Sequence, residues 1–171
     1  MAWLKYLLAA IAIAGAGGAL AQAPYPAKPV RILVQYPPGG APDLNARMLA
    51  QHLSASLGQP FVVENRSGAN GNIATEAVAR SSPDGYTLLL SSDGPIVINP
   101  SLYPSLPFNP LRDLTPVVLA TSVAFYLLAA PDFPANSVQD LIALARQHPD
   151  KYSYASSGYG SQHHLAMEML K

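Results

Sequence analysis

Apolar side chains recur along this chain at two alternating spacings. Short runs rich in β-branched and aromatic residues predict buried strands, and they lie at 30–36, 61–64 and 86–91. The segment after the first run has the spacing of one helical face, with Leu49, Leu53 and Leu57 at successive turns. A second helix is expected at 73–80. This order predicts a parallel sheet with helices on its faces, so the expected fold class is α/β.

The alternation resumes after an interruption in the middle of the chain. Residues 94–113 contain five prolines and break the pattern. Beyond them, further strands are expected at 115–120, 125–130 and 151–155. The pair Ser137 and Asp140 has the spacing of a capping box, which predicts a helix to about residue 147. A last amphipathic helix is expected at 162–171.

The unit that begins near residue 125 has only two expected strands and two expected helices, too few to close a sheet. Leu165, Met169 and Leu170 still mark an apolar helical face where the sequence ends. We therefore expect a first domain at 24–122, an incomplete second domain at 123–171, and a chain that is a fragment of a longer protein.

The first 23 residues have the pattern of a cleavable secretory signal peptide. One positive charge, Lys5, precedes an uncharged run of 16 residues, shorter than the roughly 20 needed to span a membrane. Small residues then form A-x-A cleavage patterns at 19–21 and 21–23. An uncleaved anchor is the alternative, and the glycines disfavour it. The expected location is the periplasm, which a chain without cysteine suits.

The composition excludes several classes of protein. Ten Lys and Arg balance ten Asp and Glu, so the basic excess usual in nucleic-acid binders is absent. Without cysteine, neither disulfides nor cysteine-ligated metals are possible. Half of the residues are hydrophobic, which excludes a disordered chain.

Three glycine- or serine-rich loops follow expected strands, and they are the candidate binding site. In open parallel sheets, ligands lie outside the carboxyl ends of the strands. Glycines allow close approach, and free N–H groups and hydroxyls suit a small carboxylate. The alternative is that these loops bind no ligand, because every parallel sheet needs such glycines in the loops between its strands and helices. The candidates are Pro38, Gly39, Gly40, Ala41 and Asp43 after the first strand, Ser91 and Ser92 after the third, and Ser156, Ser157, Gly158, Gly160, Ser161 and His163 in the second unit.

Enzyme, cofactor and metal motifs are absent or incomplete. Gly158-x-Gly160 lacks the third glycine of a dinucleotide fingerprint, and Ser161 stands in no G-x-S-x-G elbow. A hydrolase using Ser161 with His163 or His164 remains the enzymatic alternative, without an acid partner. We expect neither an enzyme nor a cofactor. Asp43 and Arg47 are spaced i, i+4, and we interpret them as an ion pair on the helix surface. A ligand-binding role for Asp43 is the less favoured interpretation.

Five motifs in order resemble one known family. They read YPPGGAPD (36–43), ENRSGANGN (64–72), SPDGYTLLLSS (82–92), NPSLYPSLPFNPLRDL (99–114) and SYASSGYGSQHHL (153–165). Together they resemble the Bug family, the TctC-like substrate-binding proteins of tripartite tricarboxylate transporters. The resemblance runs from about residue 25 to residue 171.

This resemblance implies a fold and a function. The fold is the two-domain clamshell of type II periplasmic binding proteins, with domain 1 nearly complete here and domain 2 only partly present. The cleft holds a small di- or tricarboxylate, and the loaded monomer delivers it to an inner-membrane permease. The same resemblance assigns the candidate loops to the cleft and adds Gly68 and Asn70 as supporting residues. Because family members are roughly twice as long, a truncated remnant without transport function is the alternative.

Overall fold

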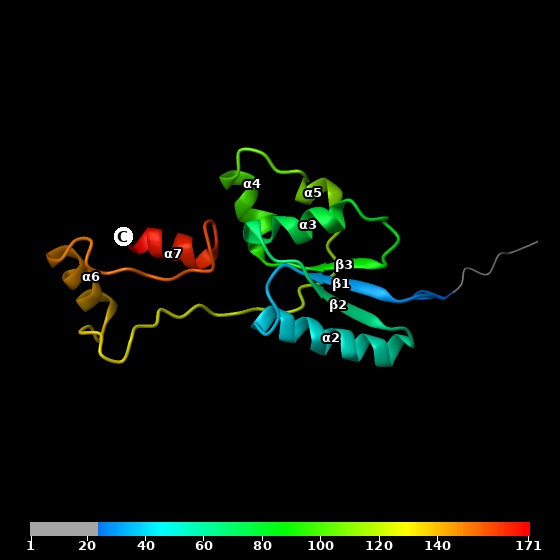
Figure 1. The fold of residues 1–171 in the computed structure, drawn as a ribbon, viewed down its shortest axis with the longest axis horizontal. Helices are drawn as coiled ribbons and strands as arrows, with labels where there is room; N and C mark the ends of the chain where they lie inside the picture. The colour runs from blue at the N-terminus through cyan, green and yellow to red at the C-terminus, as the bar shows by residue number, and fades with distance from the viewer. Residues whose placement is uncertain (1–23) are drawn as a thin grey trace, which may run out of the picture.

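A three-stranded parallel sheet forms the centre of the computed structural model, which describes residues 24–171. The strand order is β2-β1-β3 (Figure 1). The strands are β1 (Val30–Val34), β2 (Phe61–Asn65) and β3 (Thr87–Leu90). In register, Val30 lies opposite Phe61, and Arg31 lies opposite Thr87. The α/β class and these three strands are confirmed, whereas the expected signal peptide lies outside the described residues.

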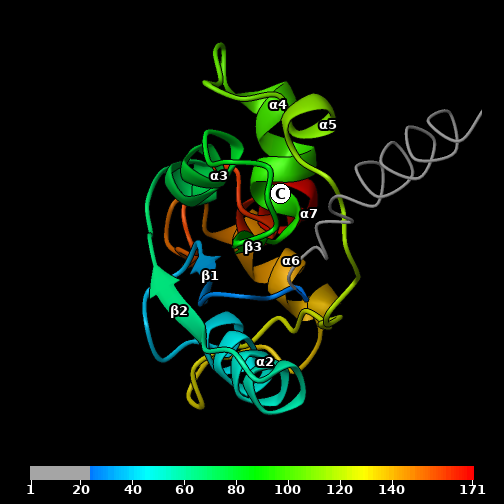
Figure 2. The ribbon, with the colours of Figure 1, turned by 90° about the vertical axis from the view of Figure 1, so that its right-hand side faces the viewer.

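Helices cover both faces of this sheet, as Figures 1 and 2 show. Helix α2 (Ala41–Leu57) lies on one face, and α3 (Asn72–Ala79) lies on the other, on the side of α4 (Asn99–Leu102) and α5 (Pro110–Asp113). A 3₁₀ turn, η1 (Ala69–Gly71), precedes α3, and a π-helical turn, η2 (Gly94–Ile98), follows β3. The proline-rich break is thus a series of short helical turns.

The core lies between the central strand and α2. Val30, Ile32 and Val34 alternate along β1 onto the face where Ala46 and Ala50 are buried. The period of two in a strand places these three side chains together. Small alanines allow the helix to pack closely on them, and this packing fixes the orientation of the loop between β1 and α2.

The three strands expected after residue 114 do not form, so this part of the prediction is wrong. Residues 115–130 and 151–155 include no strand pairing. A strand requires a neighbour for its main-chain hydrogen bonds, and the described residues provide none there. The two expected helices are confirmed as α6 (Val138–Gln147) and α7 (Gln162–Leu170). The Oγ of Ser137 accepts from the N–H of Asp140 at 3.1 Å, as a capping residue should.

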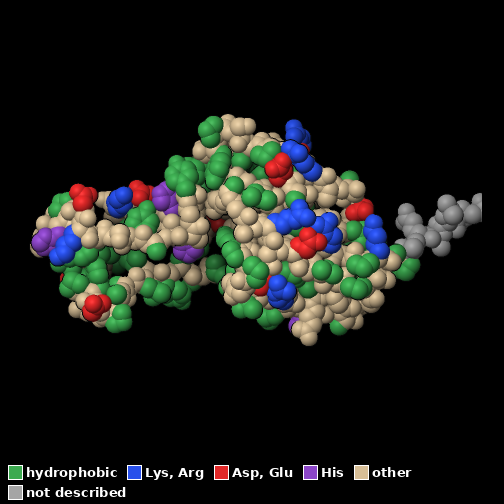
Figure 3. Space-filling model, viewed as in Figure 1, with side chains coloured by type: hydrophobic (Ala, Val, Ile, Leu, Met, Phe, Trp, Pro, Cys, Tyr) green, Lys and Arg blue, Asp and Glu red, His purple; other side chains and the backbone are tan. Residues whose placement is uncertain are grey.

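The part of the chain after residue 114 is also open to solvent. Of residues 115–171, all described by the structure, only Gly160 and Ser161 are buried. Figure 3 shows hydrophobic side chains on the surface of this smaller lobe. Within residues 24–171, no helix combines the length and the apolar character needed to cross a membrane.

Candidate ligand-binding site

A buried glutamine joins the ends of the two neighbouring strands β1 and β3. Gln35 directly follows β1, and its side chain is 2% exposed. Its Oε1 accepts from the Ser91 hydroxyl at 2.9 Å and from the Ser92 N–H at 3.3 Å. Its Nε2 donates to the Ser92 Oγ at 2.6 Å. Because a main-chain N–H can only donate, the bond from Ser92 fixes which way the Gln35 amide points.

Two further groups complete the contacts around this amide. The hydroxyl of Tyr36 lies 3.0 Å from the Ser92 Oγ. Gly71, at φ +90°, approaches the amide so closely that an added Cβ would stand 2.8 Å from the Gln35 Cδ. The candidate residues Ser91 and Ser92 are therefore held in place by a glutamine that the sequence analysis missed. A glutamine at the carboxyl end of a buried apolar strand was the signal for it.

The loop between β1 and α2 is held by the carboxylate of Asp43. Its Oδ2 accepts from the Gly39 N–H at 2.9 Å and from the Arg47 Nε at 3.0 Å. Its Oδ1 accepts from the Asn65 amide at 2.8 Å. The hydrogen bond from Arg47, followed by those from Gly39 and Asn65, lowers the pKa of Asp43 to about 2.

The predicted ion pair of Asp43 and Arg47 therefore forms, but it is not a plain surface pair. Asp43 is 2% exposed, because the carboxylate turns inward to the loop. Both of its oxygens are satisfied by the protein's own donors. The side chain shapes the loop, and Gly39 adopts the φ of +90° that the turn requires.

The same loop presents main-chain donors to solvent. Pro38, Gly39, Gly40 and Ala41 are exposed. Among the described residues, the N–H groups of Gly40 and Ala41 have no acceptor. These groups lie at the beginning of α2, where the helix dipole favours negative charge. The loop therefore has the donors that bind a carboxylate oxygen.

Three asparagines form a second polar network beside η1 and η2. Asn99 is fully buried, and its Nδ2 donates to the Asn72 Oδ1 at 2.6 Å and to the main-chain oxygen of Asn70 at 3.2 Å. Its Oδ1 accepts from the Asn70 Nδ2 at 2.9 Å. The sequence analysis included Asn70 as a supporting residue but missed Asn72 and Asn99, which the proline-rich break concealed.

The third predicted loop packs on this network. A Cβ added to Gly160 would lie 3.3 Å from the Asn70 Nδ2 and 3.5 Å from the Asn99 Oδ1, and it would overlap Leu102. On another side of Asn70 stands Gly94, whose added Cβ would lie 3.1 Å from the same Nδ2. Asn70 thus adjoins both the turn after β3 and the turn before α7. The turn after β3 and the turn before α7 therefore meet at Asn70, and Gln35 links Ser91 and Ser92 to the end of β1.

The remaining candidates lie at the exposed side of that third loop. Ser157 Oγ is 3.0 Å from His163 Nδ1, and the ring of His163 meets Phe125 edge-on. Ser156 Oγ accepts from the Gly158 N–H at 3.3 Å. These contacts orient the loop but bury little of it.

Ser161 has a structural partner rather than a catalytic one. Its Oγ accepts from the His164 main-chain N–H at 3.2 Å and so caps α7. No histidine ring nitrogen bonds to this hydroxyl in the described part of the chain. Residues 24–171 also contain no cluster of three His, Asp or Glu side chains able to hold a metal ion.

Comparison with known proteins decides between a hydrolase and a binding protein. The model of the TctC family, described as the tripartite tricarboxylate transporter family receptor, matches residues 45–171. The chain belongs to this family. The BugT protein of Bordetella pertussis is 44% identical over 162 residues, which are 94% of this chain and 50% of BugT. TctC-family proteins are periplasmic binding proteins rather than enzymes.

Two solved structures from Rhodopseudomonas palustris resemble the chain. MatC from Rhodopseudomonas palustris, solved with bound malate, has a TM-score of 0.77 and 33% identity, covering 85% of this chain and 51% of MatC. An R. palustris protein solved with adipate has a TM-score of 0.74 and 36% identity, covering 85% of this chain and 48% of that one. The chain thus spans about half the length of the relatives it matches. It is a partial α/β domain of the periplasmic binding-protein fold.

Proposed function

We propose that this chain contributes the first part of the binding site of a periplasmic protein that captures a small organic carboxylate. The supporting observation is a pair of junctions, one at Gln35 between the ends of β1 and β3 and one at Asn70 between the turns after β3 and before α7. Gln35 joins the loop after β1 to Ser91 and Ser92, and Asn70 adjoins both Gly94 and Gly160. A carboxylate placed there would face N–H groups and hydroxyls from three segments that are distant in the sequence.

The donors at this region favour a carboxylate over a cation. The exposed loop offers the N–H groups of Gly40 and Ala41, and the nearby Arg47 is engaged by Asp43. Neutral donors can bind an anion without a compensating charge, because each carboxylate oxygen accepts two or more hydrogen bonds. Similar structures solved with malate and with adipate, which are both dicarboxylates, support a dicarboxylate ligand, and a tricarboxylate is the further possibility within the same proposal.

The proposed roles of the candidate residues follow from their positions. Pro38, Gly39, Gly40 and Ala41 form the N–H-presenting loop, and Asp43 holds it in shape. Ser91 and Ser92 line the site from β3. The opposite side of the site comes from Ser156, Ser157, Gly158, Gly160, Ser161 and His163. We further propose export by the signal peptide 1–23, a monomeric state, and delivery to the permease of a tripartite tricarboxylate-type transporter.

The open state of residues 115–171 bears on how tightly this chain binds. A clamshell gains affinity by enclosing its ligand between two domains, and here the second side buries only Gly160 and Ser161. We therefore expect the chain by itself to bind more weakly than micromolar. A chain that has lost transport function is the second candidate, favoured by this open lobe. A dissociation constant in the micromolar range or tighter would overturn the expectation of weak binding.

A titration followed by amide NMR signals tests the proposed function. Malate or adipate should shift the signals of Gly40, Ala41 and Ser92 and those of the turn at 158–161. The diamide of the same acid is the control ligand, since it keeps the size and loses the charge. Titration to tens of millimolar without any shift in these loops would argue against carboxylate binding by this chain.

One substitution removes a single proposed donor. Ala41→Pro deletes the Ala41 N–H at the first helical position, where proline is well tolerated, and Gly40 already has the extended ψ of 167° that precedes proline readily. The matched control Ala41→Gly keeps the N–H. We expect Ala41→Pro to weaken carboxylate binding about tenfold and Ala41→Gly to change it little. Equal affinities of the two variants would exclude this N–H as a ligand donor.

A further inference from the structure

The hydroxyl of Ser92 has a fixed hydrogen-bond direction. A serine hydroxyl has one hydrogen to donate and two lone pairs that accept. The Ser92 Oγ accepts from the Gln35 Nε2 at 2.6 Å and from the Gly94 N–H at 3.4 Å. The orientation of the Gln35 amide is itself fixed, because its Oε1 accepts from the main-chain N–H of Ser92, which can only donate. Both lone pairs of the Ser92 hydroxyl are therefore occupied, and only its hydrogen is left to form a further bond.

Tyr36 provides the acceptor for that hydrogen. Its hydroxyl lies 3.0 Å from the Ser92 Oγ, and donation by Ser92 is the direction that does not crowd a third donor onto this oxygen. Among the described residues, no other acceptor lies within hydrogen-bond distance of the Ser92 Oγ. The Tyr36 oxygen therefore accepts from Ser92. Its own phenolic hydrogen then has no partner within residues 24–171.

The protein holds Tyr36 at both ends. Its ring packs against the core between β1 and α2 and is only half-buried. Its main-chain oxygen accepts from the Asn65 Nδ2 at 3.0 Å, and the same nitrogen donates to the Asp43 Oδ1. Tyr36 thus contacts the network that shapes the loop after β1 through its main chain, and the turn after β3 through its hydroxyl. Its unpartnered hydrogen lies at the ends of the strands, where the candidate site is.

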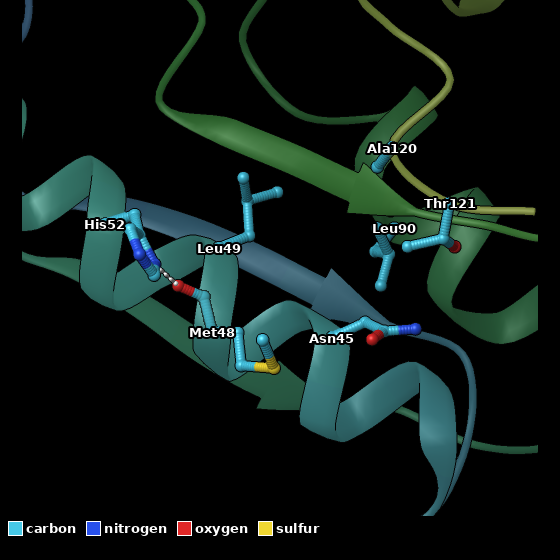
Figure 4. A pocket seen from close by; sticks show the side chains of 7 residues that line it. All are labelled: Asn45, Met48, Leu49, His52, Leu90, Ala120 and Thr121. Carbon is cyan, nitrogen blue, oxygen red and sulfur yellow. Dashed lines mark hydrogen bonds between the residues drawn. The ribbon is translucent and has the colours of Figure 1, made fainter.

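A cavity of about 260 Å³ between α2, β3 and residues 120–121 is less suited to a charged group. Figure 4 shows its lining, in which Leu49 of α2 and Leu90 of β3 form apolar walls. The Nδ1 of its histidine, His52, is bonded to the main-chain oxygen of Met48 at 2.8 Å. The cavity suits an apolar group, whereas the donors for a carboxylate lie at the ends of the strands.

We propose that the hydroxyl of Tyr36 donates a hydrogen bond to a carboxylate oxygen of the bound acid. The donors then form a directed series, from the Gln35 amide to the Ser92 hydroxyl, from Ser92 to Tyr36, and from Tyr36 to the ligand. Each bond polarises the next, so the last hydrogen is a stronger donor than that of an isolated phenol. A charged acceptor gains most from such a donor. This inference rests on the proposed carboxylate binding.

Removal of one oxygen atom tests the inference. Tyr36→Phe keeps the ring that packs on the core and deletes the hydroxyl. We expect malate binding, followed by the amide signals of Gly40 and Ala41, to weaken about tenfold. The control Tyr152→Phe deletes the hydroxyl of another half-buried tyrosine, one that packs on Phe133, and should change the affinity less than about twofold.

The outcomes separate this inference from the proposed function. If the wild type binds malate and Tyr36→Phe binds it equally well, the role of Tyr36 is overturned while carboxylate binding stands. If the wild type does not bind malate or adipate at all, both are overturned. A loss of affinity confined to Tyr36→Phe supports the inference.

A second variant separates donation to the ligand from acceptance of the Ser92 hydrogen. A 3-fluorotyrosine incorporated at position 36 has a more acidic hydroxyl, which donates more strongly and accepts more weakly. At about pH 6 this phenol stays protonated, and we expect it to bind malate about twofold more tightly than the wild type. An unchanged or weaker affinity would show that Tyr36 serves only as the acceptor for Ser92, and would overturn the proposal.

Discussion

Residues 24–114 and residues 115–171 carry the same kind of sequence pattern, yet only the first region forms a packed layer structure. In the first, β1 lies between two strands and buries Val30, Ile32 and Val34 against α2. In the second, neither α6 nor α7 has a buried residue, and no strand forms. Helices complete their hydrogen bonds within one segment, whereas strands need a neighbour. A local pattern is thus enough for a helix and not enough for a sheet.

The two regions pack tightly against each other at the turn at Gly160. The turn at Gly160 packs on Asn70, Asn99 and Leu102 of the first region, and Gly160 and Ser161 are the buried residues of the second. The contrast between a packed and an open region can be tested in the sheet, in the asparagine network and at the turn at Gly160.

The largest effect is expected in the packed sheet. Leu33 on β1 is fully buried, so Leu33→Ala should lower the free energy of unfolding by about 2–5 kcal/mol. The matched control is Leu128→Ala in the open region, where the side chain is 85% exposed, and its effect should stay within about 0.5 kcal/mol. Urea denaturation followed by circular dichroism measures both. A similar loss in the two variants would contradict the contrast between the regions.

A somewhat smaller effect is expected at the asparagine network. Asn99→Ala removes the acceptor of Asn70 and the donor to Asn72, leaving buried polar groups unpaired at about 1–3 kcal/mol. Denaturation measures the loss, and hydrogen exchange should quicken at Asn70 and in the turn at Gly160. Asn136→Ala, in an exposed loop, is the control. Unchanged exchange at Gly160 would show that the network does not support this contact.

The contact at Gly160 should come apart without unfolding the first region. Gly160 has φ +77°, and an added Cβ would overlap Leu102, so Gly160→Ala should release the turn. We expect cleavage by a broad-specificity protease within 115–160 to accelerate several-fold, because that segment then opens more often. The unfolding free energy of the first region should change little. The control is Gly158→Ala: Gly158 also has a positive φ, but its added Cβ would meet no atom within 4 Å. Equal cleavage of the two variants would mean that backbone strain, and not the overlap with Leu102, releases the turn.

The smallest effect is a pH dependence at the loop after β1. The pKa of Asp43 is about 2 in the folded chain and about 3.9 when unfolded. The carboxylate therefore stabilises the fold above about pH 4, and this contribution is lost as the pH falls towards 2. The side chain of the Asp43→Asn variant does not titrate, so the variant lacks this stabilisation. Its urea midpoint should lie below that of the wild type at pH 6, and the difference between the two midpoints should shrink as the pH falls. A constant gap between pH 6 and pH 2.5 would rule out this linkage.

Local signals predicted the helices well and the site in part. Ser137 caps α6, as its spacing to Asp140 predicted, and a glycine, Gly58, ends α2 in the left-handed conformation. The loops after β1 and β3 were identified because glycine and serine follow apolar runs. Gln35, Asn72 and Asn99 were missed, since their bonds join residues that are 27 or more positions apart.

The sequence by itself determined the α/β class, the three strands of the sheet, the capped helices and the family, because these depend on local periodicity and on ordered motifs. Only the tertiary structure decided that Asp43 turns inward to hold its loop and that one buried glutamine ties β1 to β3. It also decided that the runs after residue 114 remain unpaired. Each of these depends on which distant main-chain and side-chain groups meet, and hydrogen bonds across that distance leave no period in the sequence.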